Sequence, residues 1–136
     1  MASIRREILL YVPAEYAWDA LADVGALHTR LVAGFVTDCV LDGKGARLVT
    51  FANGMTAREL IVDVDARERR VVWSAVGGRL SHHNASAQVC PDGPGRCRLV
   101  WIADLLPNEL APAIATMIEQ GTAAMKRTLE GSYGAG

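Results

Sequence analysis

The chain has 136 residues, of which 51% are apolar and 21% are charged. This is the size and composition of one globular domain, so we expect residues 1–136 to fold around a single core. Fourteen basic and fifteen acidic residues give a net charge of −1, which argues against a nucleic-acid-binding surface. No apolar run approaches the ~18 residues that cross a bilayer, and none has the form of a signal peptide. We therefore expect a cytoplasmic protein without membrane insertion.

The three cysteines do not have the spacing of a metal site. Cys39 stands alone, whereas Cys90 and Cys97 flank a turn at 91–95 that would bring their strands together. A disulfide between Cys90 and Cys97 is one alternative. Two buried thiols are the other, and we favour them because disulfides are rare in the cytoplasm.

The first third of the chain combines a strand with two short helices. Residues 3–11 mix charged and apolar side chains and are expected to form a strand, which Pro13 ends. Proline also suits the first turn of a helix, which we expect over 15–23. Gly25 ends that helix, and residues 26–32 are expected to form a second one.

From residue 34 the pattern changes to β-strands separated by turns. Asn53-Gly54 is the strongest hairpin signal in the chain. The regular spacing of turns between residues 42 and 95 indicates an antiparallel meander. The expected strands cover 34–41, 47–52, 55–65, 70–76, 80–90 and 98–106.

The final segment has the periodicity of a helix. Asn108 or Ala111 can cap it, and Pro112 suits its first turn. Its apolar residues recur every three or four positions, which predicts one apolar stripe on a helix of about 20 residues. Ala113, Gly121 and Ala124 are small, and Met117 and Met125 are flexible. Such residues either allow close contact with the sheet or leave a cavity, and the sequence leaves both open. The stripe consists of Leu110, Ile114, Met117, Ile118, Gly121, Met125 and Leu129.

Four stretches of the chain resemble the START/birch-pollen-allergen-like (SRPBCC) superfamily, and most of all its bacterial polyketide cyclase/dehydrase and lipid transport branch. They are residues 12–21 (VPAEYAWDAL), 45–47 (GAR), 56–59 (TARE) and 98–101 (RLVW). The resemblance implies an α+β helix-grip fold, in which a curved antiparallel seven-stranded sheet wraps around a long C-terminal helix and two short helices follow the first strand. It also implies a deep apolar cavity between sheet and helix. The family has no universal catalytic motif, so no catalytic residue is carried over by position.

Charged residues inside apolar strands are the first candidates for chemistry. A turn one residue longer than the two-residue minimum places Val49 opposite Glu59 and puts Arg47 and Glu59 on the inner face. A strict two-residue turn points Arg47 and Glu59 to opposite sides. We favour the longer turn because it also gathers Val49, Phe51 and Ile61 inside. Arg47 and Glu59 are then either an acid/base carboxylate beside an oxyanion holder or a structural ion pair near the rim.

Histidine and tryptophan residues supply the other candidates. His83 shares a mainly apolar strand face with Ala85, so we expect it to point into the cavity as a general base or acid. A wall histidine without a catalytic role is the alternative. His28 is expected near the cavity mouth or on the surface. By the same alternation, Trp73 and Trp101 belong to the inner wall.

Two functions follow from these observations. The first is binding of a small hydrophobic or aromatic molecule, as in polyketide cyclase/dehydrase-like or lipid-transport-like proteins. The second is a cofactor-independent cyclase or dehydratase, in which His83 or Glu59 moves a proton and Arg47 stabilises an enolate. Dinucleotide, phosphate-loop and zinc-protease motifs are absent, so we expect no cofactor and no metal, in a monomer or homodimer. The expected ligand-binding residues are Val49, Phe51, Ile61, Trp73, Ala85, Trp101, Met117, Gly121, Met125 and His28.

Overall fold

One antiparallel sheet of seven strands dominates the computed structural model, which describes residues 1–135. The strands are β1 (Ala2–Leu10), β2 (Val36–Leu41), β3 (Ala46–Phe51), β4 (Thr56–Asp65), β5 (Arg70–Val76), β6 (His82–Pro91) and β7 (Cys97–Leu106). Their order in the sheet is β1-β7-β6-β5-β4-β3-β2, so β1 and β2 are its edges. All seven expected strands are confirmed, and with them the helix-grip arrangement.

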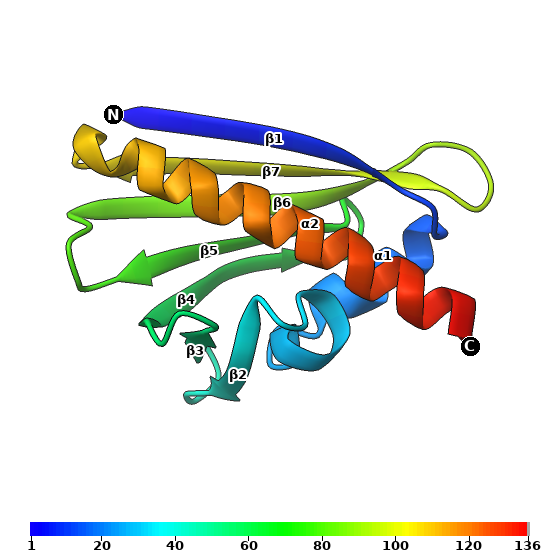
Figure 1. Cartoon of the computed structure of the whole chain (residues 1–136), viewed down its shortest axis with the longest axis horizontal. Helices are drawn as coiled ribbons and strands as arrows, with labels where there is room; N and C mark the ends of the chain where they lie inside the picture. The colour runs from blue at the N-terminus through cyan, green and yellow to red at the C-terminus, as the bar shows by residue number, and fades with distance from the viewer. Residues whose placement is uncertain (136) are drawn as a thin grey trace.

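Two α-helices pack on the inner face of the sheet (Figure 1). Helix α1 (Ala14–Ala22) follows β1, and a single π-helical turn (Leu27–Leu31) takes the place of the expected second helix. Helix α2 (Ala111–Ala135) is 25 residues long, which exceeds the expected length because Gly131 does not end it. Its C-terminal half lies beside α1, where the Tyr16 hydroxyl and the Ser132 hydroxyl are 2.6 Å apart.

The β3–β4 hairpin has a three-residue turn, residues 52–54. Arg47 pairs with Glu59 and Val49 pairs with Ala57. The expected turn length and the common inner face of Arg47 and Glu59 are therefore confirmed. The expected pairing of Val49 with Glu59 is wrong by two residues, because a turn of three residues brings Arg47, not Val49, opposite Glu59.

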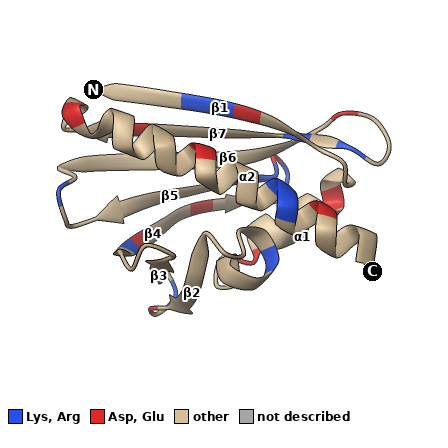
Figure 2. Ribbon diagram, viewed as in Figure 1, with Lys and Arg blue, Asp and Glu red and all other residues tan. Residues whose placement is uncertain are grey.

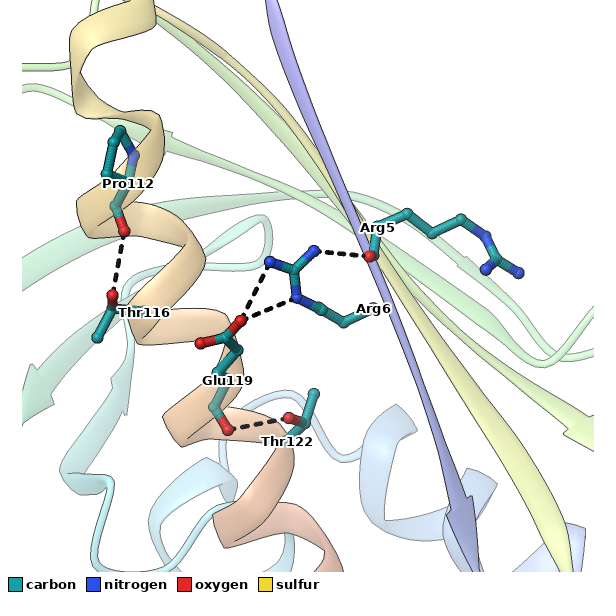
Figure 3. Close-up of polar contacts among 6 residues, drawn as sticks. All are labelled: Arg5, Arg6, Pro112, Thr116, Glu119 and Thr122. Carbon is teal, nitrogen blue, oxygen red and sulfur yellow. Dashed lines mark hydrogen bonds and ion pairs between the residues drawn. The ribbon is translucent and has the colours of Figure 1, made fainter.

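Polar contacts with β1 hold α2 along the sheet edge. Arg6 donates to Glu119 Oε1 from Nε at 3.2 Å and from Nη2 at 3.1 Å (Figure 3). Further along α2, Lys126 Nζ donates to the Leu9 carbonyl at 2.8 Å and to Glu130 Oε2 at 2.7 Å. The helix is thus fixed to one edge of the sheet, while the β2 edge lies on the other side of the inner face.

The packed core lies under α2 from Ile118 onward, that is, under its middle and its C-terminal half. Ile118, Ala124, Met125 and Leu129 are buried there, whereas Ala113 nearer the start of α2 is exposed. Each large apolar side chain that is fully buried contributes about 1.5–3 kcal/mol relative to an exposed one. Packing therefore secures one end of the helix and leaves room beneath the other.

The three cysteines are free thiols. Cys97 pairs with Pro91, and Cys90 pairs with Arg98. The two cysteines are therefore one residue out of register, and their side chains point to opposite faces of the sheet. Cys97 is buried in the core and Cys90 is half-buried. The disulfide alternative is wrong for this structure, and only one of these two thiols is buried as expected.

Basic and acidic residues are interspersed over the elements of the fold (Figure 2). Most are ion-paired locally, as in the exposed pair of Arg58 Nε and Asp42 Oδ2 at 3.0 Å. Within residues 1–135, no helix combines the length and the apolar character needed to cross a membrane.

Candidate functional site

A cavity of about 1090 Å³ lies between the inner face of the sheet and α2. Exposed lining residues define its mouth, which is bounded by the loop between β5 and β6 (residues 77–81), the β3–β4 turn and the first half of α2. The lining also extends to outer-face residues of β2, β3 and β4, so part of this volume is open to solvent. Among the expected ligand-binding residues, the cavity wall includes Val49, Phe51, Trp73, Trp101, Met117 and Met125.

Four expected ligand-binding residues lie outside the lining. Ile61 sits beside an irregularity in the β4–β5 pairing, and Ala85 is buried in the sheet. A Cβ atom on Gly121 would be 2.9 Å from Trp101 Cζ3, so Gly121 allows close packing rather than forming a cavity wall. His28 belongs to the π-helical turn, and its buried Nδ1 has no hydrogen-bond partner in the described part of the chain, residues 1–135.

Arg47 and Glu59 form a buried ion pair in the wall of the cavity. Arg47 Nε donates to Glu59 Oε1 at 2.8 Å, and the two side chains are 4% and 10% exposed. Arg47 Nη1 also donates to the Val24 carbonyl at 3.1 Å, and its guanidinium lies 5.6 Å from the Trp73 ring centre. Burial raises the pKa of Glu59, and the charge of Arg47 opposes this shift. The pair thus offers a carboxylate of enhanced basicity beside a fixed cation.

His83 lines the same cavity and is held in one orientation by the backbone. Its Nδ1 accepts a hydrogen bond from the Ala75 N–H at 2.9 Å. Burial lowers the pKa of His83, and the neighbouring His82 lowers it further. The ring is therefore neutral, and because Nδ1 is an acceptor, the proton is on Nε2. In this tautomer His83 presents a hydrogen-bond donor, not a base, to its surroundings.

These polar groups lie in one row across the sheet. Arg47 pairs with Glu59, Glu59 pairs with Ala75, and Ala75 contacts His83 through its N–H. Glu59 and His83 are thus two strands apart, which is roughly 10 Å between their backbones. The small side chain of Ala75 leaves the space between them open. Within residues 1–135, no three His, Cys, Asp or Glu side chains are grouped so as to hold a metal ion.

Aromatic side chains complete the wall. Trp73 and Trp101 meet edge to face at 5.7 Å between ring centres, and Phe35 and Phe51 do so at 5.4 Å. Phe35, Ala75 and the loop between β5 and β6, here called the mouth loop, line the cavity although the sequence did not predict them there. Phe35 was expected in the strand over 34–41, but β2 begins only at Val36, so strand alternation does not set the direction of the Phe35 side chain.

Comparisons with known proteins agree with this architecture. The profile of the family described as polyketide cyclase/dehydrase and lipid transport matches residues 1–130. No curated protein matches the chain significantly.

Solved structures of similar fold share few residues with the chain. The protein XoxI from Bacillus cereus is 17% identical with a TM-score of 0.83, covering 95% of this chain and 96% of its own. A START superfamily protein from Mycobacterium smegmatis is 12% identical with a TM-score of 0.74, covering 96% of this chain and 95% of its own. The di-domain ARO/CYC protein BexL from the BE-7585A biosynthetic pathway is 21% identical with a TM-score of 0.79, covering 96% of this chain and 47% of its own. By its sequence and its helix-grip fold, the chain belongs to the polyketide cyclase/dehydrase and lipid transport family.

Proposed function

We propose that the protein binds a small, flat, hydrophobic molecule that carries an oxygen acceptor at one end and a hydroxyl group at the other. The observation that carries this proposal is the cavity of about 1090 Å³, which has an apolar wall interrupted by a donor at His83 and a carboxylate at Glu59. Known small-molecule sites have this character, with a few placed polar groups in an apolar pocket.

The spacing of the polar groups supports a ligand of about two fused rings. A carbonyl oxygen would accept the His83 Nε2–H, and a hydroxyl would donate to Glu59 across the gap above Ala75. The edge-to-face pair of Trp73 and Trp101 would contact the ring system. Membership of a family whose members bind hydrophobic molecules is consistent with this assignment.

Calorimetric titration with four naphthalenes tests the proposal. The probes are 6-acetyl-2-naphthol, which has both oxygens, 2-acetylnaphthalene, 2-naphthol and naphthalene. We expect 6-acetyl-2-naphthol to bind most tightly. The acetyl oxygen should raise the affinity about 2–10-fold through its neutral hydrogen bond with His83, and the hydroxyl should raise it by a larger factor through its hydrogen bond with the charged Glu59. Ala75→Leu fills the gap and should abolish this preference, whereas Ala66→Leu in the exposed β4–β5 turn should not. Failure of all four probes to bind would refute the proposal.

A second candidate, cofactor-independent cyclisation and dehydration, is favoured by the basic carboxylate of Glu59 beside Arg47. Glu59 would take a proton from the carbon next to a substrate carbonyl, and Arg47 would stabilise the enolate oxygen. The enolate carbon would attack a second carbonyl, and the new alkoxide would take back the proton that Glu59 holds. Loss of this hydroxyl and a neighbouring proton as water would form the double bond. His83, as a neutral donor, would hold a carbonyl oxygen rather than remove a proton.

Proton exchange distinguishes turnover from simple binding. In D₂O the protein should accelerate exchange of the acidic carbon-bound protons of 2-tetralone, as followed by NMR, if Glu59 acts as a base. Glu59→Gln keeps the size of the side chain and should remove the acceleration. A wild-type exchange rate equal to that of buffer, with 2-tetralone demonstrably bound, would leave binding as the function and eliminate this enzymatic mechanism.

A further inference from the structure

The cavity mouth carries one charged side chain that the proposed function does not use. Arg79 lies in the loop between β5 and β6 and belongs to the lining. It follows Gly77 and Gly78, whose φ values of 86° and 64° shape a tight turn that other residues rarely adopt. Leu80, the next residue, packs against the core, so the loop is anchored while Arg79 stays exposed at the rim.

The other arginines of the lining are neutralised by neighbours. Arg47 pairs with Glu59, and Arg58 pairs with Asp42. Arg79 has no ion-pair partner within residues 1–135. Figure 2 accordingly shows a basic residue and no acidic one in the loop between β5 and β6.

One acidic residue of the lining, Asp38, has no cationic partner among the residues that the structure describes, and it is distant from the mouth loop. Asp38 lies on β2, three strands from β5, which is roughly 14 Å by strand spacing. Its Oδ1 accepts the Cys39 N–H at 3.0 Å. Since the buried pair carries no net charge and His83 is neutral, Arg79 is the lining residue that contributes an uncompensated positive charge beside the mouth loop.

We propose that Arg79 binds an anionic group of the ligand, a carboxylate or a phosphate, at the mouth of the cavity. This inference rests on the proposed function, because the apolar body of the ligand must occupy the cavity for its charged end to reach Arg79. The rim includes the Asn53 amide, the Thr56 hydroxyl and the ion-paired Arg58, and between them lie apolar side chains such as Met55 and Ile114. A guanidinium in such surroundings pairs well with a carboxylate or phosphate, which it can bind through two parallel hydrogen bonds.

Binding of charged and neutral naphthalenes tests the inference. The probes are 2-naphthoate, 2-naphthyl phosphate and the neutral, similarly shaped 2-naphthamide, measured by calorimetry at low salt. We expect at least one anion to bind about 2–5-fold more tightly than the amide, as for a partly exposed ion pair. Arg79→Gln should abolish this preference. Arg67→Gln should retain it, because Arg67 also has no ion pair among residues 1–135 but lies in the β4–β5 turn, at the other end of β5.

The outcomes separate this inference from the proposed function. If neither anion binds more tightly than 2-naphthamide, or if the preference survives in Arg79→Gln, the role of Arg79 is refuted while binding itself stands. If none of the three probes binds the wild-type protein, the proposed function fails first. Tighter binding of the phosphate than of the carboxylate, or the reverse, identifies which anionic group Arg79 binds.

Discussion

Arg47 and Glu59 face each other across β3 and β4, with Arg47 Nε 2.8 Å from Glu59 Oε1. The same arginine donates to the Val24 carbonyl at 3.1 Å and so joins the sheet to the segment between α1 and the π-helical turn. Residues of that turn form part of the cavity wall. The pair therefore has a structural role as well as exposing a carboxylate to the cavity, and the two roles are separable by experiment.

Removing the arginine should be costly. Arg47→Met leaves Glu59 buried without its counterion, and we expect a loss of about 3–5 kcal/mol in the free energy of unfolding. Urea denaturation at pH 7 measures this loss. Arg58→Met is the matched control, because the Arg58–Asp42 pair is 46% and 48% exposed and should cost at most about 1 kcal/mol. Equal losses of unfolding free energy in the two variants would show that the buried pair stabilises the fold no more than the exposed pair does.

The pH dependence of stability should report the raised pKa of Glu59. Burial raises this pKa above 4.5 in the folded protein, so the folded state holds the proton more tightly than the unfolded chain does. Wild-type protein should therefore lose stability relative to Glu59→Gln as the pH rises from 4.5 through the folded-state pKa. Urea denaturation of both proteins between pH 4 and pH 7 measures the difference. The lowered pKa values of Glu7 and Glu130 act in both proteins and cancel. A difference that grows in the opposite direction would mean that Arg47 outweighs burial.

Most of the fold could be predicted because strong local signals agree with it. Turn residues separate the strands, and the apolar stripe of the last segment marks α2. The register of the β3–β4 hairpin could not be settled in the same way, since Asn53-Gly54 is compatible with turns of two or three residues. The π-helical turn was expected only as a short helix, because its five residues contain no complete period of the apolar pattern.

The cavity-lining residues could be predicted from the sequence where they lie on strands, but not where they lie in loops. Alternation placed His83, Trp73 and Trp101 on the inner face, and each lines the cavity. It could not show that Ala75 donates its N–H to the His83 ring, because that depends on how β5 and β6 diverge. Phe35 lies in an irregular segment, where side-chain direction has no sequence signature.

Two glycines of α2 should respond oppositely to alanine. At Gly121 a Cβ atom would be 2.9 Å from Trp101 Cζ3 and 3.3 Å from Phe35 Cε2, so Gly121→Ala should destabilise the protein by about 1–2 kcal/mol through overpacking. At Gly131 a Cβ atom meets nothing within 4 Å, so Gly131→Ala should stabilise it by about 0.5–1 kcal/mol through helix propensity. Denaturant midpoints measure both. A stabilising Gly121→Ala would show that Trp101 moves aside freely.

Thiol reactivity should separate the three cysteines. Burial raises the pKa of Cys97 to about 11 and also raises that of Cys39, so neither forms the reactive thiolate readily. Cys90 is half-buried and is accessible from the outer face. Iodoacetamide at pH 8 followed by peptide mass spectrometry should label Cys90 first, and label the other two only after denaturation. Labelling of Cys97 at the rate of Cys90 would contradict its burial.

The tautomer of His83 decides which chemistry this residue can perform. Because Nδ1 accepts the Ala75 N–H at 2.9 Å, we expect the proton on Nε2, and we expect protonation of the ring only below pH 6.5 because burial lowers its pKa. Long-range ¹H–¹⁵N correlation NMR of labelled protein between pH 5 and pH 8 measures both properties, and the variants His28→Gln and His82→Gln assign the signals. A proton on Nδ1 near neutral pH would break the Ala75 hydrogen bond and return a lone pair to the cavity. His83 could then act as the general base, which is the role that the present structure gives to Glu59.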